Sequence, residues 1–421
     1  MSAQPPLKVL ETHGASLTPD GGKTRSGLSC GRYLFFNRLQ HRFMRPFDAL
    51  TGLSRSLSAQ MPASLEPKRV LLCMQAHIGD LLYATAAIPV VRKAFPDARI
   101  DFLVHPTAAH LLAGHPDIGQ IHEINHWKLD RSTRPMWQKL LSYLQQRRRV
   151  IKALRDADYA LAIDLYAYFP NSIPLLRASG IPLRLGWASG GFGGLLSHAR
   201  DWDCRGQHVL DWHRKLLATL PACRPHTGLA RTSLPAATEA FARARALLQQ
   251  AGAGDDYLCL HIGAGGAHRQ WGEQAWIELA RECAGFAKPI VLLGFGPVEE
   301  ALAARIATAA PGCINLAGRL TFSELSAVIA QTRLFVGLDS MAAHLAAAHD
   351  VPLVGIFPGI MDGTWKPVSA QARIVITPTP CSPCFLPDGC PSMSCLRQTG
   401  VREVMSAITS LIYRHRESRH V

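Results

Sequence analysis

The sequence lacks any continuous run of about 18 apolar residues, the length that a helix needs to cross a bilayer. Its first thirty residues contain proline, aspartate and several glycines where a signal peptide has an apolar segment. Acidic residues are also few, since 31 Asp and Glu against 45 Lys and Arg leave a formal net charge of +14. These absences predict a soluble cytoplasmic protein that attracts anions such as nucleotides, nucleic acid, acidic glycans or lipid.

Cysteine is sparse, with 11 in 421 residues. Seven cysteines are scattered, several of them in apolar stretches, as expected for reduced thiols in a cytosolic protein. The remaining four lie close together in the sequence: Cys381, Cys384, Cys390 and Cys395. Their first pair has C-x2-C spacing, and four thiols suffice for a tetrahedral structural zinc or iron site. Reduced thiols or disulfides in a proline-rich loop are the alternative.

The length exceeds the size at which one hydrophobic core usually stops growing, so two domains are expected. With 48% hydrophobic and 18% charged residues, the chain can bury large cores. We predict a basic extension at 1–66, an N-terminal domain at 67–225, a C-terminal domain at 236–400 and a final helix at 401–421.

Both predicted domains show apolar segments of strand length that alternate with helical stretches. In the first, the strand-like segment Arg69–Met74 precedes a helical stretch from Leu81 to Phe95. In the second, 257–262 and 334–337 are typical of buried strands. This succession predicts two α/β, Rossmann-like domains with parallel sheets, whose ligands bind at the carboxyl ends of the strands, facing a cleft.

The first candidate site residue is Asp80, in Met74-Gln-Ala-His-Ile-Gly-Asp80, directly after a predicted strand. Gly79 permits a sharp turn that presents the carboxylate where the next helix starts. Such a carboxylate is suited to act as a general base. A plain helix cap gives the same pattern.

A glycine-rich turn, Gly263-Ala-Gly-Gly-Ala-His-Arg-Gln-Trp271, follows a strand of the second domain. Gly263 and Gly265 let backbone N–H groups approach an anion, and Arg269 adds a fixed positive charge. The turn is neither a Walker A loop nor a G-x-G-x-x-G fingerprint, so it predicts neither a P-loop nor a nicotinamide site.

A third segment, Val336-Gly-Leu-Asp-Ser-Met-Ala-Ala-His344, marks the end of a strand and the start of an alanine-rich helix. Ser340 and the N–H groups of the first helical turn suit a pyrophosphate, and His344 lies about one turn further on. The alternative is that Asp339 or Ser340 simply caps a buried helix and that His344 is a core residue.

The order of these segments resembles glycosyltransferase family 9, the ADP-heptose:lipopolysaccharide heptosyltransferases. The resemblance also includes Leu293-Gly-x-Gly-x-x-Glu-Glu300 and Asn315-Leu-Ala-Gly-Arg-Leu-Thr-Phe-Ser-Glu-Leu325, and it extends from about Arg69 to the C-terminus. It implies a GT-B fold with an N-terminal acceptor domain and a C-terminal nucleotide-sugar domain. The expected partners are a nucleotide-sugar donor and a glycolipid acceptor at the inner membrane surface.

The resemblance also implies roles for the candidate residues. Asp80 matches the family's catalytic base. The residues matching its donor site are Gly263, Gly265, Arg269, Glu299, Glu300, Asp339, Ser340 and His344. Among these, Glu299 or Glu300 holds the ribose hydroxyls, and Arg269 neutralises the leaving diphosphate. No Asp-x-Asp motif accompanies these segments, so we expect catalysis to require no cofactor.

Several positions depart from the family pattern. Met341 replaces a usual glycine, where a side chain crowds the diphosphate or the sugar. Arg269 replaces lysine, Gly272 replaces proline and Ile262 replaces proline. These departures affect the expected donor sugar more than the expected fold.

The leading hypothesis is an inverting glycosyltransferase, peripheral on the inner membrane, that moves heptose from ADP-heptose to a hydroxyl of the lipopolysaccharide inner core. The basic run around Arg147–Arg155 suits an acidic glycolipid, although a solvated helix face gives the same pattern. One alternative is a heptosyltransferase acting on autotransporter adhesin proteins. Another is a non-catalytic nucleic-acid-binding protein with a four-cysteine metal site, but nucleic acid is not the expected partner because recognition motifs are lacking.

Overall fold

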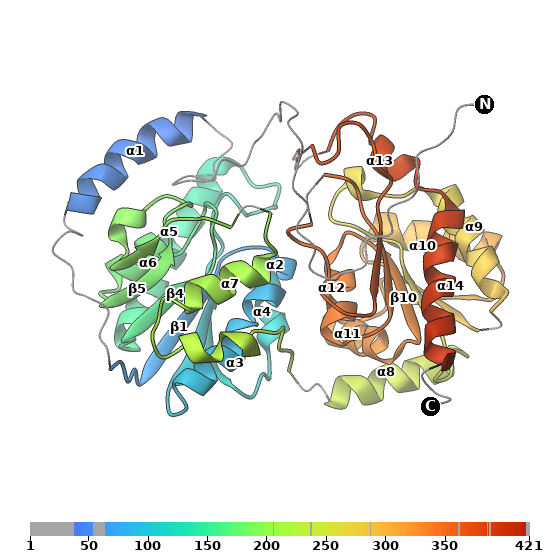
Figure 1. The fold of residues 1–421 in the computed structure, drawn as a ribbon, viewed down its shortest axis with the longest axis horizontal. Coiled ribbons are helices and arrows are strands. Elements are labelled where there is room, and N and C mark those ends of the chain that lie inside the picture. The colour runs from blue at the N-terminus through green and yellow to red at the C-terminus, as the bar shows by residue number, and fades with distance from the viewer. Residues whose placement is uncertain are drawn as a thin grey trace. The chain divides into compact units, whose positions relative to one another are not determined.

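The computed structural model describes residues 38–53, 64–204, 206–235, 238–286, 288–360, 363–384, 386 and 389–417. Much of the predicted extension, at 1–37 and 54–63, lies outside these residues. The chain divides between residues 236 and 237 into two compact units, coloured blue to green and yellow to red in Figure 1. Within the described residues, no helix is long and apolar enough to cross a membrane.

The first unit is built on a six-stranded parallel sheet in the order β3-β2-β1-β4-β5-β6. Its strands are β1 (Arg69–Met74), β2 (Arg99–Val104), β3 (Ile118–Glu123), β4 (Leu161–Asp164), β5 (Leu183–Trp187) and β6 (His198–Arg200). Its helices are α1 (Arg38–Leu53), α2 (Ile78–Ala84), α3 (Ala87–Ala94), α4 (Pro106–Ala109), α5 (Met136–Asp156), α6 (Ile173–Ala178) and α7 (Val209–Leu217).

The second unit repeats this plan with a parallel sheet in the order β12-β11-β10-β7-β8-β9. Its strands are β7 (Leu258–His261), β8 (Ile290–Leu293), β9 (Cys313–Asn315), β10 (Leu334–Leu338), β11 (Leu353–Ile356) and β12 (Ala372–Val375). Its helices are α8 (Thr238–Gln250), α9 (Glu273–Ala284), α10 (Pro297–Ala309), α11 (Phe322–Gln331), α12 (Met341–Ala348), α13 (Ser394–Arg397) and α14 (Val401–Glu417). The prediction of two α/β, Rossmann-like units is confirmed.

The helix predicted from Leu81 to Phe95 is wrong in its continuity, because the structure has two helices, α2 and α3. Pro89 lies in the first turn of α3 and has no N–H to donate to the Thr85 carbonyl one turn earlier. The Thr85 carbonyl instead accepts from the Ile88 N–H at 2.9 Å. The chain therefore starts a new helix, which packs an apolar face against the sheet.

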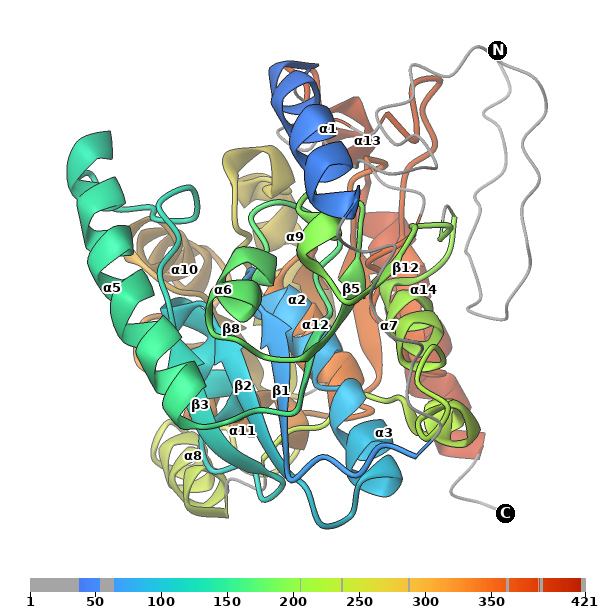
Figure 2. The ribbon, with the colours of Figure 1, turned by 90° about the vertical axis from the view of Figure 1, so that its left-hand side faces the viewer.

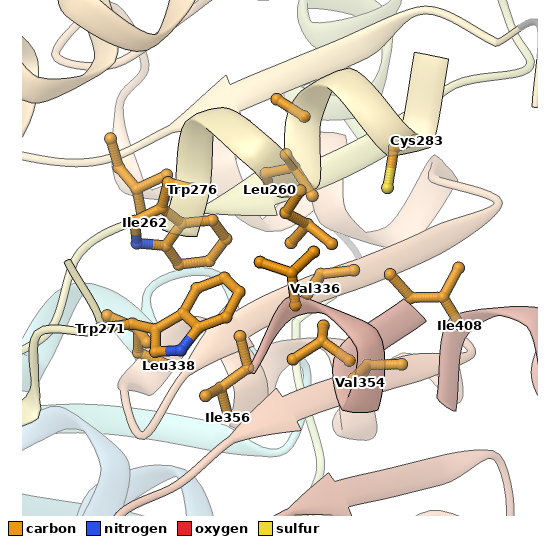
Figure 3. Packing of buried hydrophobic residues seen from close by; sticks show 14 of the residues in the cluster. Leu260, Ile262, Trp271, Trp276, Cys283, Val336, Leu338, Val354, Ile356 and Ile408 are labelled. Atoms are coloured by element: carbon orange, nitrogen blue, oxygen red, sulfur yellow. The ribbon is translucent and has the colours of Figure 1, made fainter. Parts of the chain in front are cut away.

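The core of the second unit fixes the strands that carry its candidate site. Figure 3 shows aliphatic side chains of β7, β10 and β11 packed against two tryptophans. The Trp271 and Trp276 rings meet edge to face with centroids 5.1 Å apart, a preferred aromatic geometry. The Trp271 indole N–H donates to the Thr399 carbonyl at 2.8 Å. The end of the glycine-rich turn is thus anchored to the C-terminal segment.

Candidate active site

The candidate donor residues lie after three neighbouring strands, β10, β7 and β8. Because these strands are parallel, their carboxyl ends meet at one edge of the sheet. The glycine-rich turn follows β7, Glu299 follows β8 and Asp339 follows β10. Segments that are far apart in the sequence therefore form one group within the second unit.

Arg269 and Asp339 form the electrostatic centre of this group. Arg269 Nη1 lies 3.4 Å from Asp339 Oδ2, and Arg269 Nε donates to His268 Nε2 at 3.2 Å. Burial raises the pKa of the Asp339 carboxyl, while the charges of Arg269 and His268 oppose this rise. The cation predicted for an anionic ligand is thus held beside a largely buried acid.

Ser340 is the N-cap residue of α12, yet its side chain does not cap the helix. Within the described residues, the buried Ser340 Oγ has no hydrogen-bond partner. A buried hydroxyl in this state has a desolvation cost that an incoming acceptor oxygen relieves. His344, four residues later, is buried on the same helix, and the half-buried Met341 occupies its first position. This end of α12 has the hydroxyl and the helix dipole needed for a diphosphate.

Glu299 connects the turns that follow β7 and β8. Its Oε2 accepts from the Phe295 N–H at 2.7 Å, and its carboxylate also accepts from the Ala264 N–H. Partial burial raises the pKa of Glu299, and these two hydrogen bonds oppose the rise. A β-carbon at Gly263 would overlap the Glu299 carboxylate. Gly263 is therefore required for the close approach of Glu299.

Glu300 and Gly265 have different surroundings from Glu299. The exposed Glu300 lies against Gly318, whose φ of +71° favours glycine. A β-carbon at Gly265 would meet no atom of the protein within 4 Å. Of the two glutamates, Glu299 is the one integrated into the glycine-rich turn, while Gly265 borders open space.

Asp80 lies in the first unit, after the central strand β1 and in the first turn of α2. Its Oδ2 accepts from the His77 N–H at 3.2 Å, as one half of a capping box. The N-cap residue itself is His77, so Asp80 contributes to the cap from the third helical position rather than as the N-cap that the pattern suggested. The same side chain is only half-buried and lies at the carboxyl edge of the sheet.

A second acid, Asp164, was not identified from the sequence. It ends β4, is fully buried, and accepts from the backbone N–H groups of Tyr166 at 3.1 Å and Ser172 at 2.9 Å. Burial raises the pKa of Asp164 to about 7. Tyr166 also has a raised pKa, because of burial and then the charge of Asp80. Asp164 thus positions the loop that brings Tyr166 near Asp80.

An aromatic group at the end of β3 was also missed. His126 packs against Tyr143 and Phe169, with ring centroids 4.7 and 5.7 Å away. The Lys128 ammonium lies 4.5 Å from the centre of the Phe169 ring and 5.4 Å from that of Trp127. Burial lowers the pKa of His126 to about 4, so this histidine is neutral at pH 7. No periodic pattern or motif in the sequence unites these residues.

The four-cysteine segment packs beside the glycine-rich turn. Gly389 lies against His268, and the Ser382 hydroxyl donates to the Gly359 carbonyl at 2.6 Å. Cys395 is buried, and burial together with the other three thiols raises its pKa. In the part of the chain that the structure describes, no three His, Cys, Asp or Glu side chains are placed to hold a metal ion. As placed, Cys381, Cys384, Cys390 and Cys395 do not form a ligand set.

Comparison with protein families gives a match over more than half of the chain. The model of glycosyltransferase family 9 (heptosyltransferase) matches residues 147–389. Lipopolysaccharide heptosyltransferase 3 of Escherichia coli is 27% identical over 313 residues, which cover 70% of this chain and 85% of the relative. Lipopolysaccharide heptosyltransferase 1 of Pseudomonas aeruginosa is 25% identical over 325 residues, which cover 75% of this chain and 86% of the relative.

Solved structures show the same architecture. The E. coli ADP-heptose lipopolysaccharide heptosyltransferase II matches with a TM-score of 0.66 and 20% identity, covering 83% of this chain and 99% of that one. A family 9 glycosyltransferase from Veillonella parvula matches with a TM-score of 0.70 and 17% identity, with the same coverage. These likenesses show the GT-B fold that the sequence predicted.

Proposed function

Because the chain belongs to glycosyltransferase family 9, we propose that this glycosyltransferase moves heptose from ADP-heptose to a hydroxyl of the lipopolysaccharide inner core, with inversion at the anomeric carbon. The names of its relatives support this choice of sugar and acceptor. The observation that carries it is the convergence of Arg269, Asp339 and the buried Ser340 hydroxyl at the ends of β7 and β10. Membership of an enzyme family replaces the non-catalytic alternative.

The second unit is proposed to bind the donor. The Ser340 hydroxyl, the first N–H groups of α12 and Arg269 contact the diphosphate, with His344 beside them. Glu299 accepts hydrogen bonds from the ribose hydroxyls, with Glu300 nearby. When the diphosphate enters, it competes with Asp339 for the Arg269 guanidinium. Arg269 then exchanges Asp339 for the leaving diphosphate as the partner of its positive charge.

The first unit is proposed to bind the acceptor and supply the base. Asp80 takes the proton of the acceptor hydroxyl, and the hydroxyl oxygen forms a bond to the anomeric carbon. The bond between that carbon and the diphosphate oxygen breaks, and its electron pair leaves with ADP. Positive charge develops on the sugar and negative charge on the leaving phosphate, which matches a carboxylate on one side and cationic or dipolar groups on the other.

A transfer assay with purified protein, ADP-heptose and a lipid-free inner-core oligosaccharide tests the proposal. We expect product with the wild type and a loss of about 10²- to 10⁴-fold in rate for Asp80→Asn, the usual contribution of a general base. Asp97→Asn, an exposed acid of the same unit, is the matched control. Thermal melting separates a catalytic loss from unfolding, because Asp80 also caps α2. A wild-type rate in Asp80→Asn would contradict the assignment.

The donor is tested separately by the rise in melting temperature that a bound ligand causes. We expect ADP-heptose to stabilise the protein more than UDP- or GDP-sugars do. Stabilisation by another nucleotide sugar alone would replace ADP-heptose as the donor. The adhesin acceptor remains an alternative that no feature of the structure favours.

Metal is proposed to have no catalytic part, so chelation with EDTA should leave the transfer rate unchanged. A structural zinc or iron would require the four-cysteine segment to rearrange, because its thiols do not form a ligand set as placed. Elemental analysis of the purified protein tests for it. One equivalent of metal that is lost in Cys381→Ser and Cys384→Ser would establish the site, and a metal-free wild type would exclude it.

A further inference from the structure

The outer face of α5 is apolar in its first half and basic in its second half. Its exposed side chains follow one another at helical spacing: Trp137, Leu141, Leu144, Arg148, Lys152 and Arg155. Trp137 is 65% exposed, Leu141 50% and Leu144 45%. Large apolar side chains exposed together in this way mark an interaction surface rather than ordinary solvent contact.

The opposite face of α5 accounts for how the helix is held. Only Val150 and Leu154, both in the second half of α5, are buried among its residues. In the first half, Tyr143 packs on His126 and Gln146 accepts from the Asn125 N–H at 3.0 Å. The apolar outer face in the first half is therefore not needed to attach the helix to its unit.

The first turns of α5 lie at the same edge of the sheet as Asp80. The helix connects β3 to the parallel strand β4, so it starts at the carboxyl edge and returns to the amino edge. Figure 2 shows these first turns extended beyond the ends of β2 and β3. The exposed apolar residues and the candidate base thus occur at one end of the first unit.

We propose that the outer face of α5 docks the enzyme on an anionic lipid bilayer. Trp137, Leu141 and Leu144 enter the boundary between headgroups and acyl chains, while Arg148 and Lys152 contact lipid phosphates. This inference rests on the proposed function, in which the acceptor is a glycolipid, and it explains how Asp80 reaches an acceptor that stays anchored in the bilayer.

The charges around this face favour a bilayer over a second copy of the chain. From Trp137 to Arg155 the helix contains no acid, and Asp156, the first one, pairs with Lys152 at 2.5 Å. Of the acids before the helix, Asp130 pairs with Arg134 at 3.1 Å. An antiparallel pair of α5 helices would place the cations of one copy against the apolar half of the other. Those cations would lose their hydration without gaining an acidic partner, which is unfavourable.

Flotation of the full chain with lipid vesicles tests the proposal. We expect binding to vesicles that contain phosphatidylglycerol, weak binding to phosphatidylcholine vesicles, and release by salt. Each cation near an anionic surface strengthens binding about fivefold, so Arg148→Gln should weaken it about fivefold, and adding Lys152→Gln should weaken it further by a smaller factor, because Lys152 is paired with Asp156. The double variant Trp137→Ser with Leu141→Ser should abolish the vesicle binding that persists at high salt. Leu229→Ser, an exposed leucine elsewhere in the unit, should bind like the wild type.

Transfer assays separate this inference from the proposed function. The α5 variants should keep the wild-type rate with a lipid-free acceptor and lose rate with an acceptor embedded in vesicles. If the wild type transfers nothing, the proposed function fails while flotation still reports docking. Docking is overturned if the wild type does not float with anionic vesicles or if the α5 variants float equally well. Self-association that Leu141→Ser abolishes, without vesicle binding, would assign the face to a second copy and overturn the proposal.

Discussion

The Arg269 guanidinium and the Asp339 carboxylate form an ion pair, with 3.4 Å between Nη1 and Oδ2, although they follow different strands of the sheet. The pair keeps a cation in place before any donor binds. Because Asp339 is largely buried, it also prevents the acid from being left with an uncompensated charge. A diphosphate that replaces Asp339 as the partner of Arg269 meets a side chain that is already oriented.

Replacing Arg269 should therefore affect the donor more than the fold. For Arg269→Ala we expect kcat/KM for the donor to fall about 10²- to 10³-fold, the usual effect of removing one group that stabilises a developing anion. In Arg269→Lys, kcat/KM should fall less, because lysine keeps the positive charge although it lacks the planar guanidinium that can form two parallel hydrogen bonds. Steady-state kinetics measure both, with the exposed Arg402→Ala as control. Equal rates for Arg269→Ala and Arg402→Ala would remove Arg269 from the donor site.

Two glycines of the same turn should differ in how they respond to a methyl group. Gly263→Ala displaces the end of the Glu299 side chain, which then loses its hydrogen bonds from the Phe295 and Ala264 N–H groups, so we expect a loss of stability of about 1–3 kcal/mol and weaker donor binding. Gly265→Ala meets no protein atom and should keep its stability, yet weaken binding if the diphosphate approaches there. Gly228→Ala, which also meets open space, is the control. Melting and calorimetric titration with the donor distinguish the two glycines.

Met341 should restrict the sugar or diphosphate at the start of α12. Met341→Gly removes its side chain beside Ser340, so we expect a several-fold lower KM for ADP-heptose. Glycine also weakens the helix by up to about 1 kcal/mol, and Ala347→Gly in the same helix matches this cost. A KM that rises in Met341→Gly but not in Ala347→Gly would show that the methionine contributes to donor binding.

Asp164 should make the stability of the protein depend on pH. Its pKa is about 7 when folded and ordinary when unfolded, so the folded state binds the proton more tightly. The free energy of unfolding should therefore fall as pH rises, by about 2 kcal/mol between pH 5 and pH 7. Asp164→Asn should lack this decrease. Chemical denaturation of both proteins at the two pH values measures it, and parallel curves would contradict the raised pKa.

The helices and strands that could be predicted are those determined by residues close together in the sequence. The strand Arg69–Met74 was predicted at its observed bounds because its apolar run is continuous. The strands β5, β6, β9 and β12 were not predicted; β6 and β9 have only three residues each, and β6, β9 and β12 lie at the sheet edges. Pro89 is the local signal for the break between α2 and α3, which hydrophobic periodicity alone does not reveal.

The part of the candidate site that was not predicted depends on contacts between distant segments. Asp164 has no motif around it, and its raised pKa arises from burial beneath a loop that only the folded chain creates. Arg269 and Asp339 were each predicted as site residues, but their pairing was not. It arises because β10 and β7 are neighbours in the sheet, and the succession of strands and helices along the sequence does not determine that order. Glu299 was preferred over Glu300 only once Gly263 was seen beside it.

The hydrogen bond from Trp271 to the Thr399 carbonyl has a consequence for how the enzyme is made. A ribosome synthesises the glycine-rich turn long before it synthesises Thr399 and the helix α14, whose Ile408 packs into the same core as Trp271. The turn therefore reaches its final packing only after Thr399 and α14 have left the ribosome. Nascent chains, and products truncated before Thr399, lack this anchor, so we expect their glycine-rich turn to be less firmly held.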